Sequence, residues 1–205
     1  MLDPRQWLDV PAVLEKHGEI TVVRDDLLEG GSKLRFLPFL VGDAREVVFG
    51  GPFCGGAPLA LSVMARESGR RCTIFYAKRG ELHPRQKAVQ ANGAKIVEVS
   101  PGYMTVVQKR ARDYAAQTGA FFLPLGFDVP TAVEPFLEAI AKVRQAVGDP
   151  PEVWCATGSG MLARCLAEGF PSSMIKAVAV GLQSRPGKQD FAGNVSLMHS
   201  PLDFA

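Results

Sequence analysis

A lysine that follows a glycine-rich turn has the setting in this sequence that most favours covalent chemistry. Lys33 comes after Gly30, Gly31 and Ser32 in the stretch RDDLLEGGSKLR, and apolar residues follow it. The glycines allow a tight turn and close approach of a ligand to the backbone, and Ser32 is a good N-cap for a helix that begins at Lys33. A helix N-terminus and apolar neighbours both lower the pKa of an ammonium group. We therefore predict a neutral amine that attacks a carbonyl group, with a solvated lysine as the alternative.

A second glycine-rich turn, with the sequence TGSG, follows a strand predicted over residues 152–156. The order strand, glycine-rich turn and helix presents backbone N–H groups and the positive end of a helix dipole to a phosphate. A turn that merely needs glycine is the alternative. The predicted phosphate site consists of Thr157, Gly158, Ser159, Gly160 and Met161.

A reactive amine and a phosphate site together match one cofactor, pyridoxal phosphate, which carries both an aldehyde and a phosphate. Lys33 would hold the aldehyde as a Schiff base, and the TGSG turn would hold the phosphate. No GxxxxGK[ST] motif follows a predicted strand, so a P-loop NTPase is not expected. The three histidines, His17, His83 and His199, are too far apart in sequence to suggest a metal site, and no metal is expected.

Strands and helices are predicted to alternate along the chain, which is typical of an α/β fold with parallel sheets covered by helices. A short helix is expected within residues 1–18. A second helix is expected to begin at Lys33 and to end or kink at Pro38, and another long helix is expected to begin within 128–131. The tail from Gly181 onward has no periodicity and is expected to be a loop. Strands are predicted at 19–23, 45–49, 72–77, 95–99, 121–125, 152–156 and 175–180, and helices also at 57–68, 83–92, 104–118 and from 161.

The composition of the 205 residues is ordinary for a soluble globular protein, with 47% hydrophobic and 21% charged residues and a formal net charge of +2. No basic block indicates a nucleic-acid surface. There is no apolar run long enough to span a membrane, and the N-terminus lacks the pattern of a signal peptide. We expect a cytoplasmic protein without a membrane partner, whose four cysteines are reduced and buried.

Several segments resemble the fold-type II pyridoxal-phosphate enzymes, the relatives of the tryptophan synthase β-subunit. The segment that begins at Arg24 resembles the lysine segment of one branch of this family, the branch that contains 1-aminocyclopropane-1-carboxylate deaminase and D-cysteine desulfhydrase. The matching motifs, in chain order, are RDDL, GGSK, FL and DA. Residues 45–78, 86–97 and 154–169 resemble later segments of that family. The resemblance implies a three-layer fold with helices on both faces of parallel sheets, truncated at the C-terminus, with Lys33 as the Schiff-base lysine. It also implies a homodimer and two lobes: a larger cofactor-binding lobe (1–45 and 126–205) and a smaller lobe (46–125).

The sequence departs from this branch in the loop after the second predicted strand. The branch carries a serine and an asparagine there, whereas the matching positions in this chain are glycines. The family segment that supplies a partner for the pyridine nitrogen is also not recognisable, although Ser184, Ser196 and Ser200 are candidates. The loop nevertheless gives the predicted substrate-binding residues, Cys54, Gly55, Gly56 and Ala57.

The predicted function is that of a lyase or deaminase that uses pyridoxal phosphate on Lys33 and acts at the α- or β-carbon of a small, amino-acid-like substrate. One alternative keeps the cofactor but acts on an amino-acid adduct of thymidine in viral DNA, by decarboxylation or elimination, with nucleic acid as the partner. A second alternative is a catalytically silent binding protein with the same fold. A third is a protein that binds sugar phosphates through the TGSG turn alone.

Overall fold

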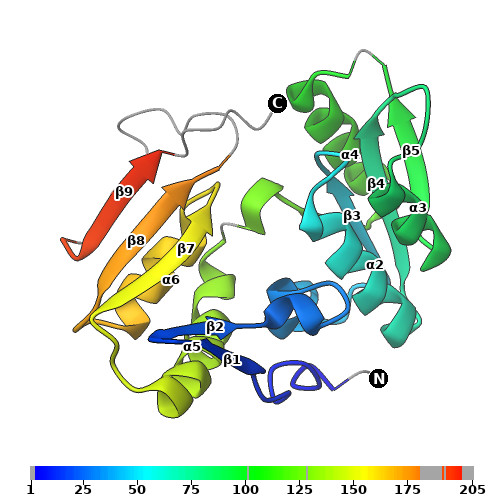
Figure 1. Ribbon diagram of the computed structural model, residues 1–205. Coiled ribbons are helices and arrows are strands. Elements are labelled where there is room, and N and C mark those ends of the chain that lie inside the picture. Colours follow the sequence, from blue (N-terminus) through cyan, green and yellow to red (C-terminus); the bar gives the residue numbers. More distant parts are fainter. Residues whose placement is uncertain (1–2, 101, 128, 181–190, 192, 200–205) are drawn as a thin grey trace.

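The computed structural model describes residues 3–100, 102–127, 129–180, 191 and 193–199, and the described residues form three β-sheets (Figure 1). The strands are β1 (Leu14–His17), β2 (Ile20–Val23), β3 (Glu46–Gly50), β4 (Arg71–Ala77), β5 (Lys95–Val99), β6 (Phe121–Leu123), β7 (Glu152–Thr157), β8 (Met174–Ala179) and β9 (Val195–His199). The α-helices are α1 (Leu37–Val41), α2 (Gly56–Ser68), α3 (Pro84–Ala91), α4 (Met104–Thr118), α5 (Val133–Val147) and α6 (Met161–Gly169). Single-turn 3₁₀ helices lie at Asp25–Leu27 (η1), Ser32–Arg35 (η2), Leu125–Phe127 (η3) and Pro130–Ala132 (η4). The alternation confirms the predicted α/β class.

The first parallel sheet has the strand order β5-β4-β3-β6 and carries helices on both faces. β3 is buried along its whole length, and its successive side chains point to opposite faces. Val47 and Phe49 pack in one apolar cluster with residues of α2, whereas Val48 packs with residues of α4. Burial on both faces is the usual state of parallel sheets. The predicted three-layer arrangement is therefore confirmed here.

The second parallel sheet has the strand order β7-β8-β9. Helix α6 packs against one face, where Ile175 and Ala177 of β8 are fully buried, and α5 packs on α6 (Figure 1). On the opposite face, Trp154 and Met174 are 59% and 40% exposed. The apolar core of this part of the protein therefore lies between the sheet and the two helices.

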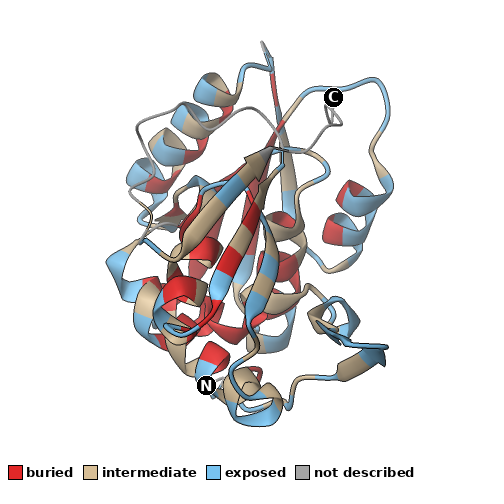
Figure 2. Ribbon diagram, turned by 60° about the vertical axis from the view of Figure 1, so that its left-hand side comes forward, coloured by how far each residue is buried: buried red, intermediate tan, exposed pale blue. Residues whose placement is uncertain are grey.

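Aromatic side chains join the lysine segment to the rest of the core. The ring of Phe36 contacts Phe136 of α5 edge to face at a centroid distance of 4.7 Å, and it contacts Phe127 at 6.3 Å. Phe127 in turn packs at 5.5 Å from Phe49 of β3. Such edge-to-face pairs stabilise a core beyond the apolar area that they bury. Figure 2 shows the buried residues gathered in the central strands and in the helices packed on them.

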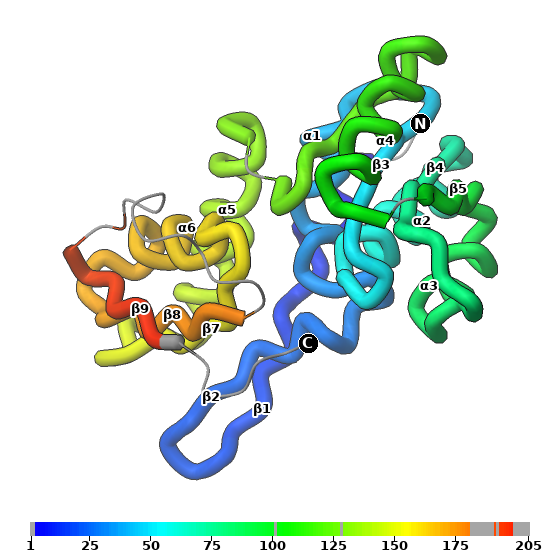
Figure 3. Tube along the Cα trace, turned by 90° about the horizontal axis from the view of Figure 1, so that it is seen from above, coloured from blue at the N-terminus to red at the C-terminus, as the bar shows by residue number. Residues whose placement is uncertain are grey.

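The prediction of a helix within residues 1–18 was wrong, because β1 and β2 form an antiparallel hairpin. His17 pairs with Ile20, so Gly18 and Glu19 form a two-residue turn. Gly18 has φ +63°, and two-residue hairpin turns favour glycine at such a position. Seen from above in Figure 3, the hairpin extends away from both parallel sheets.

Two predicted helix starts were also wrong. Ser32 is the first residue of the single 3₁₀ turn η2, and its side chain caps nothing; Gly31 precedes the turn. Pro38 does not end a helix but lies in the first turn of α1, where its missing N–H costs nothing. The helix expected to begin within 128–131 begins at Val133, after η4. Asp128 itself lies outside the described residues.

The tail was predicted to be a loop, but β9 pairs in parallel with β8, with Ala177 opposite Leu197. A five-residue strand beside glycine, asparagine and serine carries little periodic signal of its own, and its hydrogen-bonding partner comes from a distant part of the chain. The strands predicted between residues 45 and 180 are all present, each within two residues of its expected ends.

Candidate cofactor site

Two glycines place the lysine segment directly against α2. Gly30 and Gly31 have φ +97° and +76°, a region that other residues rarely adopt. A Cβ atom on Gly30 would lie 2.9 Å from the Cα atom of Ala60 in α2. The backbone before Lys33 can therefore rest on this helix only because residue 30 is glycine.

A buried arginine two residues after Lys33 anchors the same segment. Arg35 is 5% exposed, and its Nη2 lies 2.6 Å from Oδ1 of Asp25. Its Nη1 donates to the carbonyl oxygens of Val10 at 2.7 Å and Trp7 at 3.2 Å. Arg35 was not among the predicted site residues, although its position in an apolar stretch ten residues after an aspartate is a usable signal for a buried ion pair.

Lys33 is half-buried, and burial lowers the pKa of its ammonium group. Among the described residues, none forms a hydrogen bond or an ion pair with its side chain. The predicted effect of a helix dipole is absent, since η2 is a single 3₁₀ turn. Desolvation is thus the physical cause that favours the neutral, nucleophilic amine.

The TGSG turn connects β7 to α6, as predicted. Gly160 adopts φ +86° and immediately precedes the first helical residue, Met161. The first N–H groups of an α-helix have no intrahelical acceptors, and they lie at the positive end of its dipole. Ser159 packs against Gly126. A Cβ atom placed on residue 126 would lie 2.8 Å from the Cβ atom of Ser159.

Thr157 provides the observation that tests whether this turn fits a phosphate. Its Oγ1 atom is buried, and among the described residues it has no hydrogen-bond partner. An unpaired buried hydroxyl costs about 1–3 kcal/mol, so such groups are uncommon unless a ligand or water satisfies them. A hydroxyl and helix N-terminal N–H groups are suitable donors for phosphate oxygens. The residues present therefore fit the phosphate of pyridoxal phosphate.

Replacing Thr157 with valine is expected to raise the stability of the cofactor-free protein by about 1 kcal/mol, because it removes the unpaired hydroxyl. The same change should weaken binding of pyridoxal phosphate roughly tenfold, since one hydrogen bond to a charged group is lost. Thermal unfolding and equilibrium titration measure the two effects.

The matched control is Thr73→Val, because the Thr73 hydroxyl is buried but donates to Glu46 at 2.7 Å. This variant should lower stability and leave cofactor affinity unchanged. If Thr157→Val destabilises the protein as Thr73→Val does, the Thr157 hydroxyl has a partner and the phosphate assignment loses its support.

The connection after β6 links the lysine segment to the TGSG turn. Phe127 contacts Phe36, which follows η2, and the preceding residue, Gly126, contacts Ser159. Phe127 has φ +54°, which is uncommon for a bulky residue and indicates that its surroundings hold it in place. The arrowheads of β3 and β7 point to the same side of the molecule in Figure 1, and ligands of parallel sheets bind at these ends of strands.

The predicted substrate residues lie after β3, at the N-terminus of α2, which is the helix that supports the lysine segment. Gly55 precedes α2 in an extended conformation, and Gly56 and Ala57 form the first turn of the helix. Cys54 is exposed, so the prediction that it is buried was wrong. Its carbonyl oxygen accepts a hydrogen bond from Arg85.

Of the other three cysteines, Cys72 and Cys165 are buried and Cys155 is intermediate in exposure. Burial raises the pKa of Cys72 to about 12 and that of Cys155 to about 11, which disfavours the reactive thiolate. Ser196 lies in β9, whereas Ser184 and Ser200 lie outside the described residues. No group of three or more potential metal ligands is present among the described residues.

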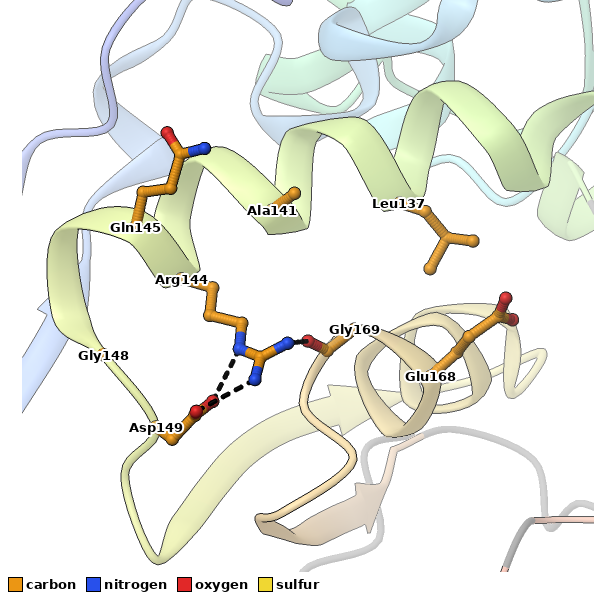
Figure 4. A pocket seen from close by; sticks show the side chains of 8 residues that line it. All are labelled: Leu137, Ala141, Arg144, Gln145, Gly148, Asp149, Glu168 and Gly169. Carbon is orange, nitrogen blue, oxygen red and sulfur yellow. Dashed lines mark hydrogen bonds and ion pairs between the residues drawn. The ribbon is translucent and has the colours of Figure 1, made fainter.

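A surface hollow of about 600 Å³ lies between α5 and α6, away from the predicted residues (Figure 4). Arg144 crosses it and pairs with Asp149 at 2.6 Å, while its Nη1 donates to the carbonyl of Gly169. The arginine is thus used to join α5 to the end of α6. The lining residues are Leu137, Ala141, Arg144, Gln145, Gly148, Asp149, Glu168 and Gly169.

Comparison with protein families assigns the chain. Residues 7–198 match the family described as pyridoxal-phosphate dependent enzyme, and the chain belongs to this family. The match confirms the predicted family and its cofactor, pyridoxal 5′-phosphate. Comparison with curated proteins gave no match.

Solved structures confirm the fold expected from the resemblance. A homologue of ACC deaminase has a TM-score of 0.75 and 18% identity over 90% of this chain and 64% of its own. A fungal L-serine ammonia-lyase from Rhizomucor miehei has a TM-score of 0.69 and 16% identity, over 83% of this chain and 60% of its own. Threonine deaminase isoform 2 from Solanum lycopersicum also has a TM-score of 0.69 and 16% identity, over 83% of this chain and 51% of its own. The chain spans between half and two-thirds of these three proteins.

Proposed function

We propose that the chain is a pyridoxal-phosphate-dependent lyase that acts at the α- or β-carbon of an amino-acid-like substrate, with Lys33 as the residue that holds the cofactor. The observation that carries this proposal is the desolvated Lys33 amine, which has no partner among the described residues, in a chain of this family. Neighbours named threonine deaminase and L-serine ammonia-lyase support an amino acid as substrate.

Each candidate residue has a separate role in this proposal. Lys33 would hold the cofactor through its aldehyde group, and its Nζ, as a free amine, would take the proton from the α-carbon of the substrate. The hydroxyls of Thr157 and Ser159 and the N–H groups at the start of α6 bind the phosphate, with Gly158 and Gly160 shaping the turn. When bound, pyridoxal phosphate supplies an electron sink for negative charge at the α-carbon.

The loop from Cys54 to Ala57 is proposed to contact the substrate. Gly55 and Gly56 have no side chains, and nothing lies within 4 Å of a Cβ placed on Gly56. This loop therefore contributes backbone groups and space, and it leaves Lys33 as the proposed group that moves the proton.

The test is an absorbance titration of the protein loaded with pyridoxal phosphate, using a panel of L- and D-amino acids. We expect at least one amino acid to shift the cofactor band and to release a keto acid, ammonia or another cleavage product. Lys33→Ala should abolish turnover. A protein whose cofactor spectrum no amino acid changes would instead be the silent binding protein.

The alternatives gain no support from the comparisons. Neither the family match nor the neighbours favour an enzyme that acts on thymidine adducts in viral DNA, or a silent binding protein. A protein that binds sugar phosphates through the TGSG turn alone leaves the desolvated Lys33 unexplained.

The lobe division, the homodimer and the cytoplasmic location remain proposals. The two lobes are supported by the sheets, because β3 to β6 and β7 to β9 come from separate stretches of chain. A homodimer is supported by the exposed Trp154 and Met174 on the face of the second sheet that is opposite α6, since parallel sheets are usually covered on both faces. Among the described residues, no helix combines the length and apolarity needed to cross a membrane.

A further inference from the structure

Positively charged side chains gather beside the proposed substrate loop. The connection from β4 to α3 and the first turn of α3 contain four exposed cations and a single acidic residue, Glu81. None of these cations forms an ion pair with a described residue, although most arginines elsewhere do so, including Arg5, Arg24, Arg66 and Arg144. The four cations are Lys78, Arg79, Arg85 and Lys87.

The guanidinium group of Arg79 lies over the ring of Phe53, which adjoins the substrate loop. Its guanidinium carbon lies 3.9 Å from the centre of the Phe53 ring, and the same ring packs edge to face on His83 at 5.3 Å. Stacking on an aromatic face occupies the plane of a guanidinium and leaves its N–H edges available. Those edges match the two oxygens of a carboxylate or phosphate.

Arg85 is fixed to the next residue of the same loop. Its Nη1 donates a 2.7 Å hydrogen bond to the carbonyl oxygen of Cys54. One bond uses one of its five N–H donors, so the others remain available to a ligand. Phe53 and Cys54 are consecutive, so both guanidinium groups contact the same short stretch of chain.

Cations gathered on one part of the surface raise the local positive potential, and an anion bound there lowers it. Both guanidinium groups are oriented by contacts to uncharged groups, a ring face and a carbonyl oxygen, rather than by carboxylates. They lie at the carboxyl ends of β3 and β4, where ligands of parallel sheets bind. The adjoining Gly56 leaves open space, because nothing lies within 4 Å of a Cβ atom placed on it.

We propose that Arg79 and Arg85 bind a second acidic group, a phosphate or a carboxylate, carried by the side chain of the amino-acid substrate. This inference rests on the proposed function, and it specifies the substrate class: an amino acid with an acidic side chain. Lys78 and Lys87 add to the local positive potential, and the two arginines supply the directed hydrogen bonds.

The test compares L-serine with O-phospho-L-serine, which differ only in the phosphate, and includes L-aspartate to distinguish a carboxylate from a phosphate. Each is titrated into the protein loaded with pyridoxal phosphate, and both the heat of binding and the cofactor absorbance are recorded. We expect one acidic amino acid to bind at least tenfold more tightly than serine, an advantage that falls as ionic strength rises.

Arg79→Gln and Arg85→Gln should each reduce this preference for the acidic amino acid roughly tenfold, and Arg85→Lys should restore it only in part, because lysine lacks the guanidinium fork. The matched control is Arg112→Gln. Arg112 is also exposed and lies over an aromatic ring, at 5.3 Å from Phe122, but it belongs to α4 and not to the cluster. It should keep the full preference.

The outcomes separate this inference from the proposed function. Equal affinity for serine and both acidic amino acids overturns the inference, and so does a preference that Arg79→Gln and Arg85→Gln leave intact. Tighter binding of a short single-stranded oligonucleotide than of either acidic amino acid, lost in Arg79→Gln and Arg85→Gln, also overturns it, in favour of nucleic-acid binding. If an acidic amino acid binds through both arginines without changing the cofactor absorbance, the two arginines form an anion site, but its ligand is not a substrate and the proposed function fails.

Discussion

Replacing Arg35 with alanine is expected to lower the free energy of unfolding by about 3–5 kcal/mol, the usual range when one partner of a buried ion pair is removed. The Arg35 side chain is 7% exposed and that of Asp25 is 19% exposed, so the variant leaves a carboxylate with little solvent. The carbonyl oxygens of Trp7 and Val10 also lose their donor. Denaturant unfolding of the cofactor-free protein measures the loss.

The matched control is Arg24→Ala in the same motif. Arg24 pairs with Asp26 at 2.8 Å, but the Asp26 side chain is 63% exposed, so the expected loss is about 1 kcal/mol or less. A double variant, Asp25→Leu with Arg35→Met, should recover much of the lost stability, because an apolar pair replaces the ion pair. If Arg35→Ala and Arg24→Ala lower the free energy of unfolding by the same amount, Arg35 does not anchor the lysine segment as described.

Replacing Lys33 with methionine is expected to abolish covalent attachment of pyridoxal phosphate and, at neutral pH, to stabilise the cofactor-free protein. Methionine keeps the unbranched shape of the side chain but removes an ammonium group that burial disfavours. Sites that bind or react are often less stable than an apolar replacement would be. Thermal unfolding and the absorbance of protein incubated with cofactor measure the two effects.

The stabilisation should depend on pH in a definite direction. The pKa of Lys33 in the folded protein is below its ordinary value of 10.5, so folding disfavours the charged form. The cost is absent above 10.5, where the amine is neutral in both states, and it grows as the pH falls until the folded-state pKa is passed. Lys33→Met should therefore stabilise the protein more at pH 7 than near pH 10.5. The control, Lys16→Met on the exposed strand β1, should change stability by less than about 0.5 kcal/mol at either pH.

The fold could be predicted where local sequence and tertiary packing favour the same structure. β4 and β5 are buried or half-buried strands of branched and aromatic residues, and glycines end α2 and α4 in the left-handed conformation. The predicted strand at 19–23 is confirmed as β2, but its hairpin partner β1 and the edge strand β9 could not be predicted in this way. Their pairing partners, more than their own composition, determine their conformation.

The candidate site was predictable only as separate motifs. Lys33 and the TGSG turn stand out because glycines flank functional groups, and the structure places both in turns. What holds them in place is long-range: Arg35 reaches Val10, Phe127 contacts Phe36, and Gly30 rests on Ala60. The contact between Arg79 and Phe53 likewise joins residues 26 positions apart, which no local pattern indicates.

The most direct measurement is reduction of the protein with borohydride after incubation with pyridoxal phosphate, followed by proteolysis and mass analysis of the peptides. Borohydride converts an aldehyde held by a lysine amine into a stable secondary amine, so the modified residue can be read from the fragment masses. We predict a single modification, on Lys33, in the unchanged protein, and none in Lys33→Met. A modification on another lysine, or none at all with cofactor bound, would contradict the assignment of Lys33 as the cofactor-binding residue.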